Sequence, residues 1–137
     1  MTNKEVNEFY NQLNSNAVLD IPFFRVNYGL SKNRKALKSI IDSVMKRVNK
    51  VEGFNEYCVK INELIDDIKK NEDNFRLKEE AIQKSKDFQT SNQDLIDAVD
   101  EIWNEESTYE PYLIDISYFG EKISGIAEEI IFPLIKE

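Results

Sequence analysis

The sequence predicts a mostly α-helical protein built around a long antiparallel helical hairpin, with short N- and C-terminal helices. Its 137 residues include only 4 Gly and 3 Pro, with 41% hydrophobic and 32% charged residues, a composition typical of helical globular chains. Two stretches with helical apolar spacing lie on either side of the polar run 70–74. Because this length suits one domain, we expect residues 1–137 to form a single helical-hairpin domain.

The N-terminal part is expected to hold one helix and one extended segment. Residues 2–14 carry apolar residues at helical spacing, and Thr2 followed by Glu5 forms a capping box at the start of this helix. Residues 21–28 are expected to be extended, because Pro22 is excluded from a helix interior and apolar residues then alternate with polar ones.

The first arm of the hairpin is predicted by the strongest pattern in the chain. Gly29 is expected to mark a turn, and Ser31 is expected to cap the helix that follows. Apolar residues between Leu37 and Ile65 recur at alternating spacings of four and three. This spacing predicts one helix of about 40 residues, from Ser31 to near Lys70 and bent at Gly53.

The second arm follows a more weakly patterned course. Residues 70–74 are polar and form the expected tip of the hairpin. A second helix is expected over 75–105, but polar residues loosen its middle at 85–92. We expect a fresh helical start there, with Ser91 as the cap and Asp94 in the first turn.

The C-terminal part is expected to close the base of the hairpin. Residues 108–119 contain Pro111 and an apolar run, which predicts an extended segment able to pair with 21–28 in a two-stranded β-ribbon. A final helix is expected over 123–131, with its isoleucines facing inward: Ile123, Ile126, Ile130 and Ile131.

Three sequence features in this order resemble a family of short uncharacterised bacteriophage proteins. They are the segment Ile21-Pro22-Phe23-Phe24-Arg25-Val26-Asn27-Tyr28, the Ser31-Lys32-Asn33 that leads a long basic helix, and the closing Phe132-Pro133-Leu134-Ile135. The resemblance covers most of the chain and supplies no active-site residues. It implies a phage or prophage origin, the cytoplasm of a bacterial host, and an accessory role in assembly, anti-defence or host modulation.

The composition excludes several kinds of catalytic site. With 0 His, the chain has no Ser-His-Asp or Cys-His nucleophile and no His-based zinc site. The 4 glycines are isolated and begin no phosphate-binding loop, and the single Cys58 is expected to be a small core residue. We therefore expect a protein that is not an enzyme and needs no cofactor or metal.

No apolar run is long enough for a membrane span, and we expect a cytoplasmic protein without a membrane partner.

Charge is distributed unevenly along the chain, whose net charge is −8. Residues 25–50 carry eight Lys or Arg and one acid, whereas residues 94–129 carry eleven acids and one base. The two blocks could neutralise each other in a folded hairpin, or each could meet a partner of opposite charge. Like charges at helical spacing destabilise a helix, so we predict that the acidic block is kept for binding. The predicted partner is a host or phage protein with a basic surface, bound by Asp97, Asp100, Glu101, Trp103, Glu105 and Tyr109.

Other interpretations of the same residues stay open. Acidic pairs on two helices would suit a magnesium-dependent all-α nucleotide hydrolase that uses Glu63, Asp66, Asp97 and Glu101. The acids of 94–129 could instead imitate a nucleic-acid backbone. Lys32, Arg34, Lys35 and Lys38 could contact phosphates beside Phe24 and Tyr28, although the net charge of −8 leads us to expect no direct nucleic-acid binding.

Two further expectations concern assembly and the aromatic residues near the C-terminus. A hairpin with a broad apolar stripe would leave area that a second copy could cover, so we expect a homodimer or higher oligomer. The aromatic stretch is expected to lie in the core, and any member that stays exposed would be the preferred partner-binding patch: Tyr109, Tyr112, Leu113, Tyr118 and Phe119.

Overall fold

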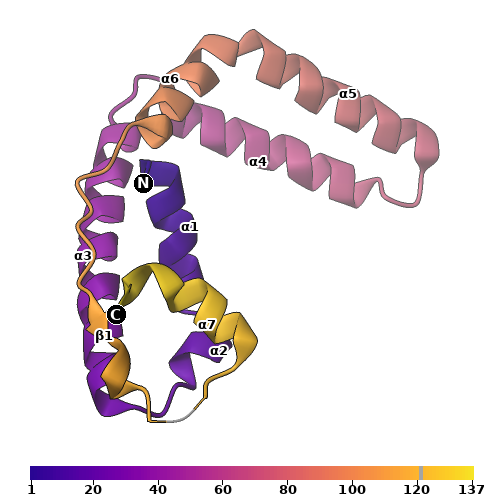
Figure 1. Ribbon diagram of the computed structural model, residues 1–137. Coiled ribbons are helices and arrows are strands. Elements are labelled where there is room, and N and C mark those ends of the chain that lie inside the picture. The colour runs from indigo at the N-terminus through magenta and orange to yellow at the C-terminus, as the bar shows by residue number, and fades with distance from the viewer. Residues whose placement is uncertain (121) are drawn as a thin grey trace. The chain divides into compact units, whose positions relative to one another are not determined.

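The computed structural model describes residues 1–120 and 122–137, and 74% of the chain is helical. The mostly α-helical prediction is therefore confirmed. The described residues form seven α-helices, two short 3-10 helices and two short strands (Figure 1). In chain order these are α1 (Asn3–Leu13), α2 (Asn16–Leu19), α3 (Phe24–Asn49), α4 (Phe54–Lys70), α5 (Phe75–Ser91), α6 (Gln93–Asn104), β1 (Ile114–Asp115), η1 (Ile116–Tyr118), α7 (Gly125–Ile131), η2 (Phe132–Leu134) and β2 (Ile135–Lys136).

The chain divides into two compact units. The first unit combines Met1–Val44 with Trp103–Glu137, and the second is the contiguous stretch Met45–Ile102. No helix among the described residues combines the length and apolar character that crossing a membrane requires.

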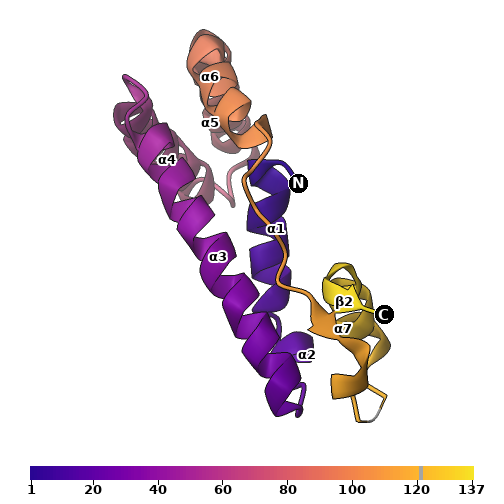
Figure 2. The same cartoon turned by 60° about the vertical axis from the view of Figure 1, so that its left-hand side comes forward.

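The core of the first unit joins α1, α2, the first part of α3, β1 and α7. Figures 1 and 2 show α1 alongside α3, with α7 packed against α1 and α2. α1 begins with the predicted capping box, in which the Glu5 amide donates to the Thr2 hydroxyl at 3.2 Å and the Thr2 amide donates to the Glu5 carboxylate at 2.7 Å. The cluster of buried side chains consists of Val6, Phe9, Leu13, Val18, Ile21, Val26, Leu30, Leu37, Ile114, Ala127, Ile131 and Leu134.

The N-terminal residues are hydrogen-bonded to the segment that follows α6. The Met1 carbonyl accepts hydrogen bonds from the Ser107 amide at 2.9 Å and hydroxyl at 2.8 Å, and Thr2 forms an antiparallel bridge with Glu106. The Met1 ammonium lies 3.4 Å from the Glu106 carboxylate. The first unit is thus built from residues that lie about a hundred positions apart in the sequence.

The prediction of an extended segment over 21–28 is wrong, because α3 already begins at Phe24. Pro22 lies just before the helix, where its missing amide costs no intrahelical bond. Gly29 and Ser31, predicted as a turn and a cap, lie inside α3. The helix forms because four fully buried residues follow one helical face: Val26, Leu30, Asn33 and Leu37.

The predicted two-stranded ribbon exists, but its second strand differs from the prediction. β1 falls within the predicted segment 108–119, but it pairs in parallel with β2, with Ile114 opposite Ile135 and Asp115 opposite Lys136. Pairing with 21–28 is impossible because most of that segment is helical. α7 begins at Gly125 with Ser124 as its cap, and Ile126 faces outward, against the prediction that it faces inward.

The second unit contains the helical hairpin, formed by α4 and α5 lying side by side and antiparallel (Figure 1). Its tip follows the prediction: Asn71 ends α4, and the Asn74 side chain caps α5 by accepting from the Leu77 amide at 3.1 Å. The Tyr57 and Phe88 rings stack across the two helices at 5.3 Å.

The hairpin arms are shorter than predicted because both long helices are interrupted. The bend expected at Gly53 is a complete break, and Gly53 adopts the left-handed conformation with φ 83° between α3 and α4. The second arm breaks at Asn92, the last residue of the stretch 85–92 where a fresh helical start was expected. Ser91 is no cap, since its hydroxyl donates back to the Asp87 carbonyl at 2.9 Å inside α5. Asp94 lies in the first turn of α6, as predicted.

Candidate functional site

The six residues predicted to bind a partner are divided between the two units. Asp97, Asp100 and Glu101 are exposed on α6 in the second unit, where Gln93 donates a hydrogen bond to the Asp97 carboxylate at 2.8 Å. Trp103, Glu105 and Tyr109 belong to the first unit, and of these only Glu105 is exposed. The Glu105 carbonyl accepts from the Asn3 amide at 2.9 Å.

Tyr109 takes part in an internal hydrogen-bond network centred on the fully buried Asn33. The Tyr109 hydroxyl donates to the Asn33 side-chain oxygen at 2.6 Å, and the Tyr112 amide donates to the same oxygen at 2.8 Å. The Asn33 side-chain nitrogen donates to the carbonyls of Gly29 and Tyr112, both at 2.8 Å. Burial raises the pKa of Tyr109 to about 12, so its hydroxyl stays protonated as a donor. Asn33 therefore holds segment 109–112 against α3.

Gly29 allows the same segment to approach α3 closely. A Cβ atom at Gly29 would lie 2.6 Å from Ile114 Cγ1 and 3.5 Å from Tyr112 Cδ1. Real Cβ atoms essentially never approach other atoms as closely as 2.6 Å. Gly29 and Asn33 together place the Tyr112 ring beside the Tyr28 ring, with centroids 6.4 Å apart in an edge-on arrangement.

An exposed group of aromatic and cationic side chains results, which we call the aromatic–cation cluster. It consists of Phe24, Arg25, Tyr28, Lys32, Tyr112 and Tyr118. Five of its members, all except Lys32, line a hollow of about 340 Å³ together with Ile114. Phe24 is 84% exposed and Tyr28 is 52% exposed, although both rings are large and apolar. The prediction that Tyr112, Leu113 and Tyr118 lie in the core is wrong, because all three are exposed, whereas Tyr109 and Phe119 are half-buried.

The cations of this cluster are held over its rings. The Arg25 guanidinium lies 5.0 Å from the centroid of Tyr118, and the Lys32 ammonium lies 5.1 Å from the centroids of both Tyr28 and Tyr112. These distances are within the range of cation–π attraction. A side-chain hydrogen bond with Tyr28 raises the pKa of Lys32, which keeps it protonated. α3 carries no acidic residue before Asp42, so the cluster side of the helix is locally basic although the chain is acidic.

Arg34 and Lys38, which were also proposed to contact phosphates, interact with other residues of the chain. The Arg34 guanidinium donates two hydrogen bonds, of 3.0 and 2.8 Å, to the Leu13 carbonyl at the end of α1. Lys38 lies 3.3 Å from the Asp42 carboxylate one turn later. Of the predicted set, Lys32 belongs to the aromatic–cation cluster together with Phe24 and Tyr28.

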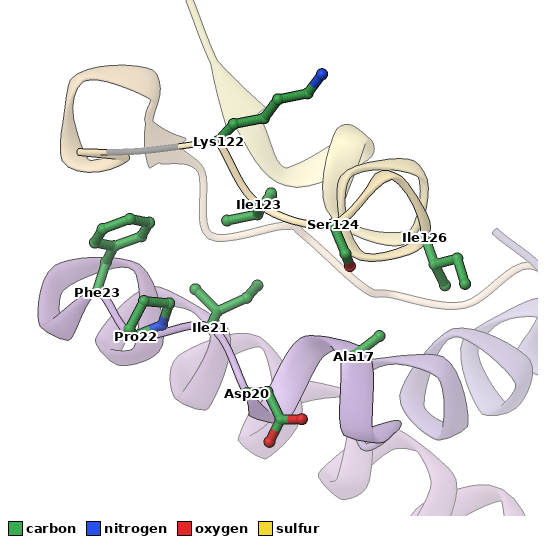
Figure 3. A pocket seen from close by; sticks show the side chains of 9 residues that line it. All are labelled: Ala17, Asp20, Ile21, Pro22, Phe23, Lys122, Ile123, Ser124 and Ile126. Atoms are coloured by element: carbon green, nitrogen blue, oxygen red, sulfur yellow. The ribbon is translucent and has the colours of Figure 1, made fainter.

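A separate cavity of about 420 Å³ lies between the end of α2 and the segment leading into α7. Figure 3 shows Ile21 and Ile123 directed toward each other across this cavity, with the Lys122 ammonium pointing away from it. Its lining is largely apolar and includes Pro22 and Phe23. Its polar lining residues are Asp20, Lys122 and Ser124, and the Ser124 hydroxyl caps α7 by accepting from the Ala127 amide at 3.2 Å. We assign this cavity no chemistry.

The carboxylates proposed for a magnesium site form no such site in the part of the chain that the structure describes. Among residues 1–120 and 122–137, no three Asp, Glu or Cys side chains converge as metal ligands would. Glu63 lies 3.8 Å from the Lys60 ammonium one helical turn away. Cys58 is half-buried in α4, close to its expected role as a small packing residue.

A scan against protein-family models, a search of curated proteins and a search of solved structures found no match to this chain. The resemblance to short bacteriophage proteins therefore stays a prediction.

Proposed function

We propose that this chain acts by binding another protein rather than by catalysing a reaction, and that the aromatic–cation cluster is its contact surface. The observation that carries this proposal is the exposure of Phe24, Tyr28, Tyr112 and Tyr118 around two cations on one face of the first unit. Tyr and Arg are the residue types that most often dominate binding energy in protein interfaces.

The fold holds this surface ready for binding. Asn33 fixes the backbone of Tyr112 through two hydrogen bonds, and the Asp115 carboxylate accepts from the Ser117 amide at 2.8 Å to shape η1 before Tyr118. The cations are already positioned on the rings, so less side-chain entropy is lost when a partner binds. A partner segment with carboxylates and apolar side chains matches this chemistry.

Nucleic acid matches it less well. Base stacking needs open ring faces, and Lys32 lies over Tyr28 and Tyr112 while Arg25 lies over Tyr118. The net charge of −8 also opposes the approach of a polyanion. The assembly, anti-defence and host-modulating roles implied by the phage resemblance are all forms of protein binding.

The test is affinity capture from a bacterial lysate with three forms of the full chain as bait: wild type, Phe24→Ala combined with Arg25→Glu, and Phe75→Ala. Phe75 is the matched control, because it is 80% exposed at the start of α5 in the second unit. We expect a specific protein to be retained by wild type and by Phe75→Ala and lost by the double variant. Equal retention by all three forms, or binding of a labelled single-stranded oligonucleotide instead, would contradict the proposal.

A further inference from the structure

A second exposed surface of the first unit has the chemistry that the aromatic–cation cluster would bind. Ile126 and Phe132 are 66% and 69% exposed, although both are large and apolar. Glu128 and Glu129 lie between them in sequence and are also exposed. With Ser124 and Gly125 these four side chains line one open groove. We call Ile126, Glu128, Glu129 and Phe132 the α7 surface.

The two surfaces lie on different elements of the same unit. The cluster occupies the start of α3 and the segment from Tyr112 to Tyr118, whereas the α7 surface occupies α7 and the residue that follows it. Ala127 and Ile131, on the opposite face of α7, are fully buried in the core. The outward face of α7 is therefore fixed by the packing of its inward face.

Charge decides which pairs of surfaces attract. Two clusters facing each other would bring together four cations, and two α7 surfaces would bring together four carboxylates. A cluster that faces an α7 surface brings the cations Arg25 and Lys32 close to the carboxylates of Glu128 and Glu129. Opposite charges give the favourable orientation, and like charges suppress the alternatives.

We propose that the α7 surface of one copy of this chain docks on the aromatic–cation cluster of a second copy. Phe132 and Ile126 would cover the exposed rings around the hollow, while Glu128 and Glu129 would meet Arg25 and Lys32 at its rim. This inference rests on the proposed function, because it names a second copy as the partner of the cluster. It also gives the predicted self-association a defined contact, between two unlike surfaces.

The experiment uses two full-length variants that each lack one surface. The first carries Phe24→Ala and Arg25→Glu and keeps the α7 surface, and the second carries Ile126→Ser and Phe132→Ser and keeps the cluster. All four side chains are exposed, so both variants should keep the wild-type circular dichroism spectrum. Sedimentation equilibrium at tens of micromolar should show the wild type and Phe75→Ala self-associating, with each variant weakened on the order of tenfold or more.

Mixing the two variants is the decisive measurement. Each mixed pair has one intact α7 surface and one intact cluster, so we expect a 1:1 heterodimer that neither variant forms alone. A mixture that stays monomeric overturns the proposal, as does a monomeric wild type at these concentrations. If either double variant unfolds, Arg25→Gln with Lys32→Gln and Glu128→Gln with Glu129→Gln replace them in the same mixing scheme.

The outcomes separate this inference from the proposed function. A monomeric wild type that still captures another protein through Phe24 and Arg25 would remove self-association and leave the proposed function standing. A monomeric wild type whose captured proteins do not depend on these residues would remove both.

Discussion

Replacing Gly29 with alanine tests whether the close approach of β1 to α3 holds the cluster in place. Helix propensity alone favours alanine inside a helix by about 1 kcal/mol. The new Cβ would lie 2.6 Å from Cγ1 and 3.0 Å from Cδ1 of Ile114, a side chain that is only 1% exposed. Such overpacking typically costs about 1–3 kcal/mol, so after the gain of about 1 kcal/mol in helix propensity the free energy of unfolding should fall by up to about 2 kcal/mol.

Gly125→Ala provides the matched control, because a Cβ atom at this helical glycine meets no atom within 4 Å. Urea unfolding followed by circular dichroism should show Gly29→Ala less stable than wild type and Gly125→Ala equal to it or slightly more stable. The intensity of near-ultraviolet circular dichroism should also fall for Gly29→Ala if Tyr28 and Tyr112 separate. Equal stabilisation by the two substitutions would refute the reasoning, because it would mean that Ile114 moves aside without cost.

Three further predictions concern the Asn33 network and the acidic residues. Asn33→Leu should lower the free energy of unfolding by about 3–5 kcal/mol, because it leaves the amide and carbonyl of Tyr112 without their partners; a loss under about 1 kcal/mol in urea titration would contradict this. Burial raises the pKa of Tyr109 from 10.0 to about 12, so the stability that depends on its neutral form is present below pH 10 and is lost as pH rises toward 12. Urea midpoints across this range should fall more for wild type than for Tyr109→Phe, and identical slopes would count against the assignment. If the four acids predicted to bind a basic partner do so, replacing all four with lysine should decrease both binding and its salt dependence: Asp97, Asp100, Glu101 and Glu105. Unchanged capture of the partner by this variant would contradict that prediction.

The start of α3 shows why a local pattern misled the prediction. Phe24, Val26 and Tyr28 alternate with polar residues as a strand would, and Pro22 precedes them. The same residues also fit a helix in which Val26 begins the buried face and Phe24 and Tyr28 lie on the exposed face. The helical alternative is hard to recognise in the sequence because Asn33, a fully buried polar residue, interrupts the apolar spacing between Leu30 and Leu37. Three of its four hydrogen bonds, those with Tyr109 and Tyr112, are tertiary and leave no signal in the local sequence.

The sequence predicted that a helical hairpin exists, but not where its helices begin and end. The polar run at 70–74 marks the tip, and the apolar spacing on either side of it predicts two helices. The helix ends at Gly53 instead of bending because this glycine adopts a φ of 83°, and the apolar spacing alone does not distinguish a bend from an end. The pairing of β1 with Ile135 and Lys136 was not predicted, because a strand of two residues carries no periodicity.

The candidate surface was partly predictable. Lys32, Phe24 and Tyr28 were grouped from sequence as a basic and aromatic set, and Tyr112 and Tyr118 were named as the preferred patch if exposed. The sequence could not predict that these two sets lie next to each other. Their contact joins positions about eighty residues apart and depends on Gly29 and Asn33. The outward orientation of Ile126 depends in the same way on which face of α7 the core buries.

The division of the chain also orders its folding during synthesis. The second unit is one contiguous stretch whose main contacts join neighbouring helices, so it can fold as soon as residue 102 has left the ribosome. The core of the first unit includes Ile114, Ile131 and Leu134 together with residues of α1 and α3. This core cannot be completed until α7 and Leu134 have been made, and until then the apolar faces of Met1–Val44 stay uncovered. The aromatic–cation cluster therefore cannot form before residues 112–118 have been made, and a chain that ended before them would present α1 and α3 without Tyr112 and Tyr118.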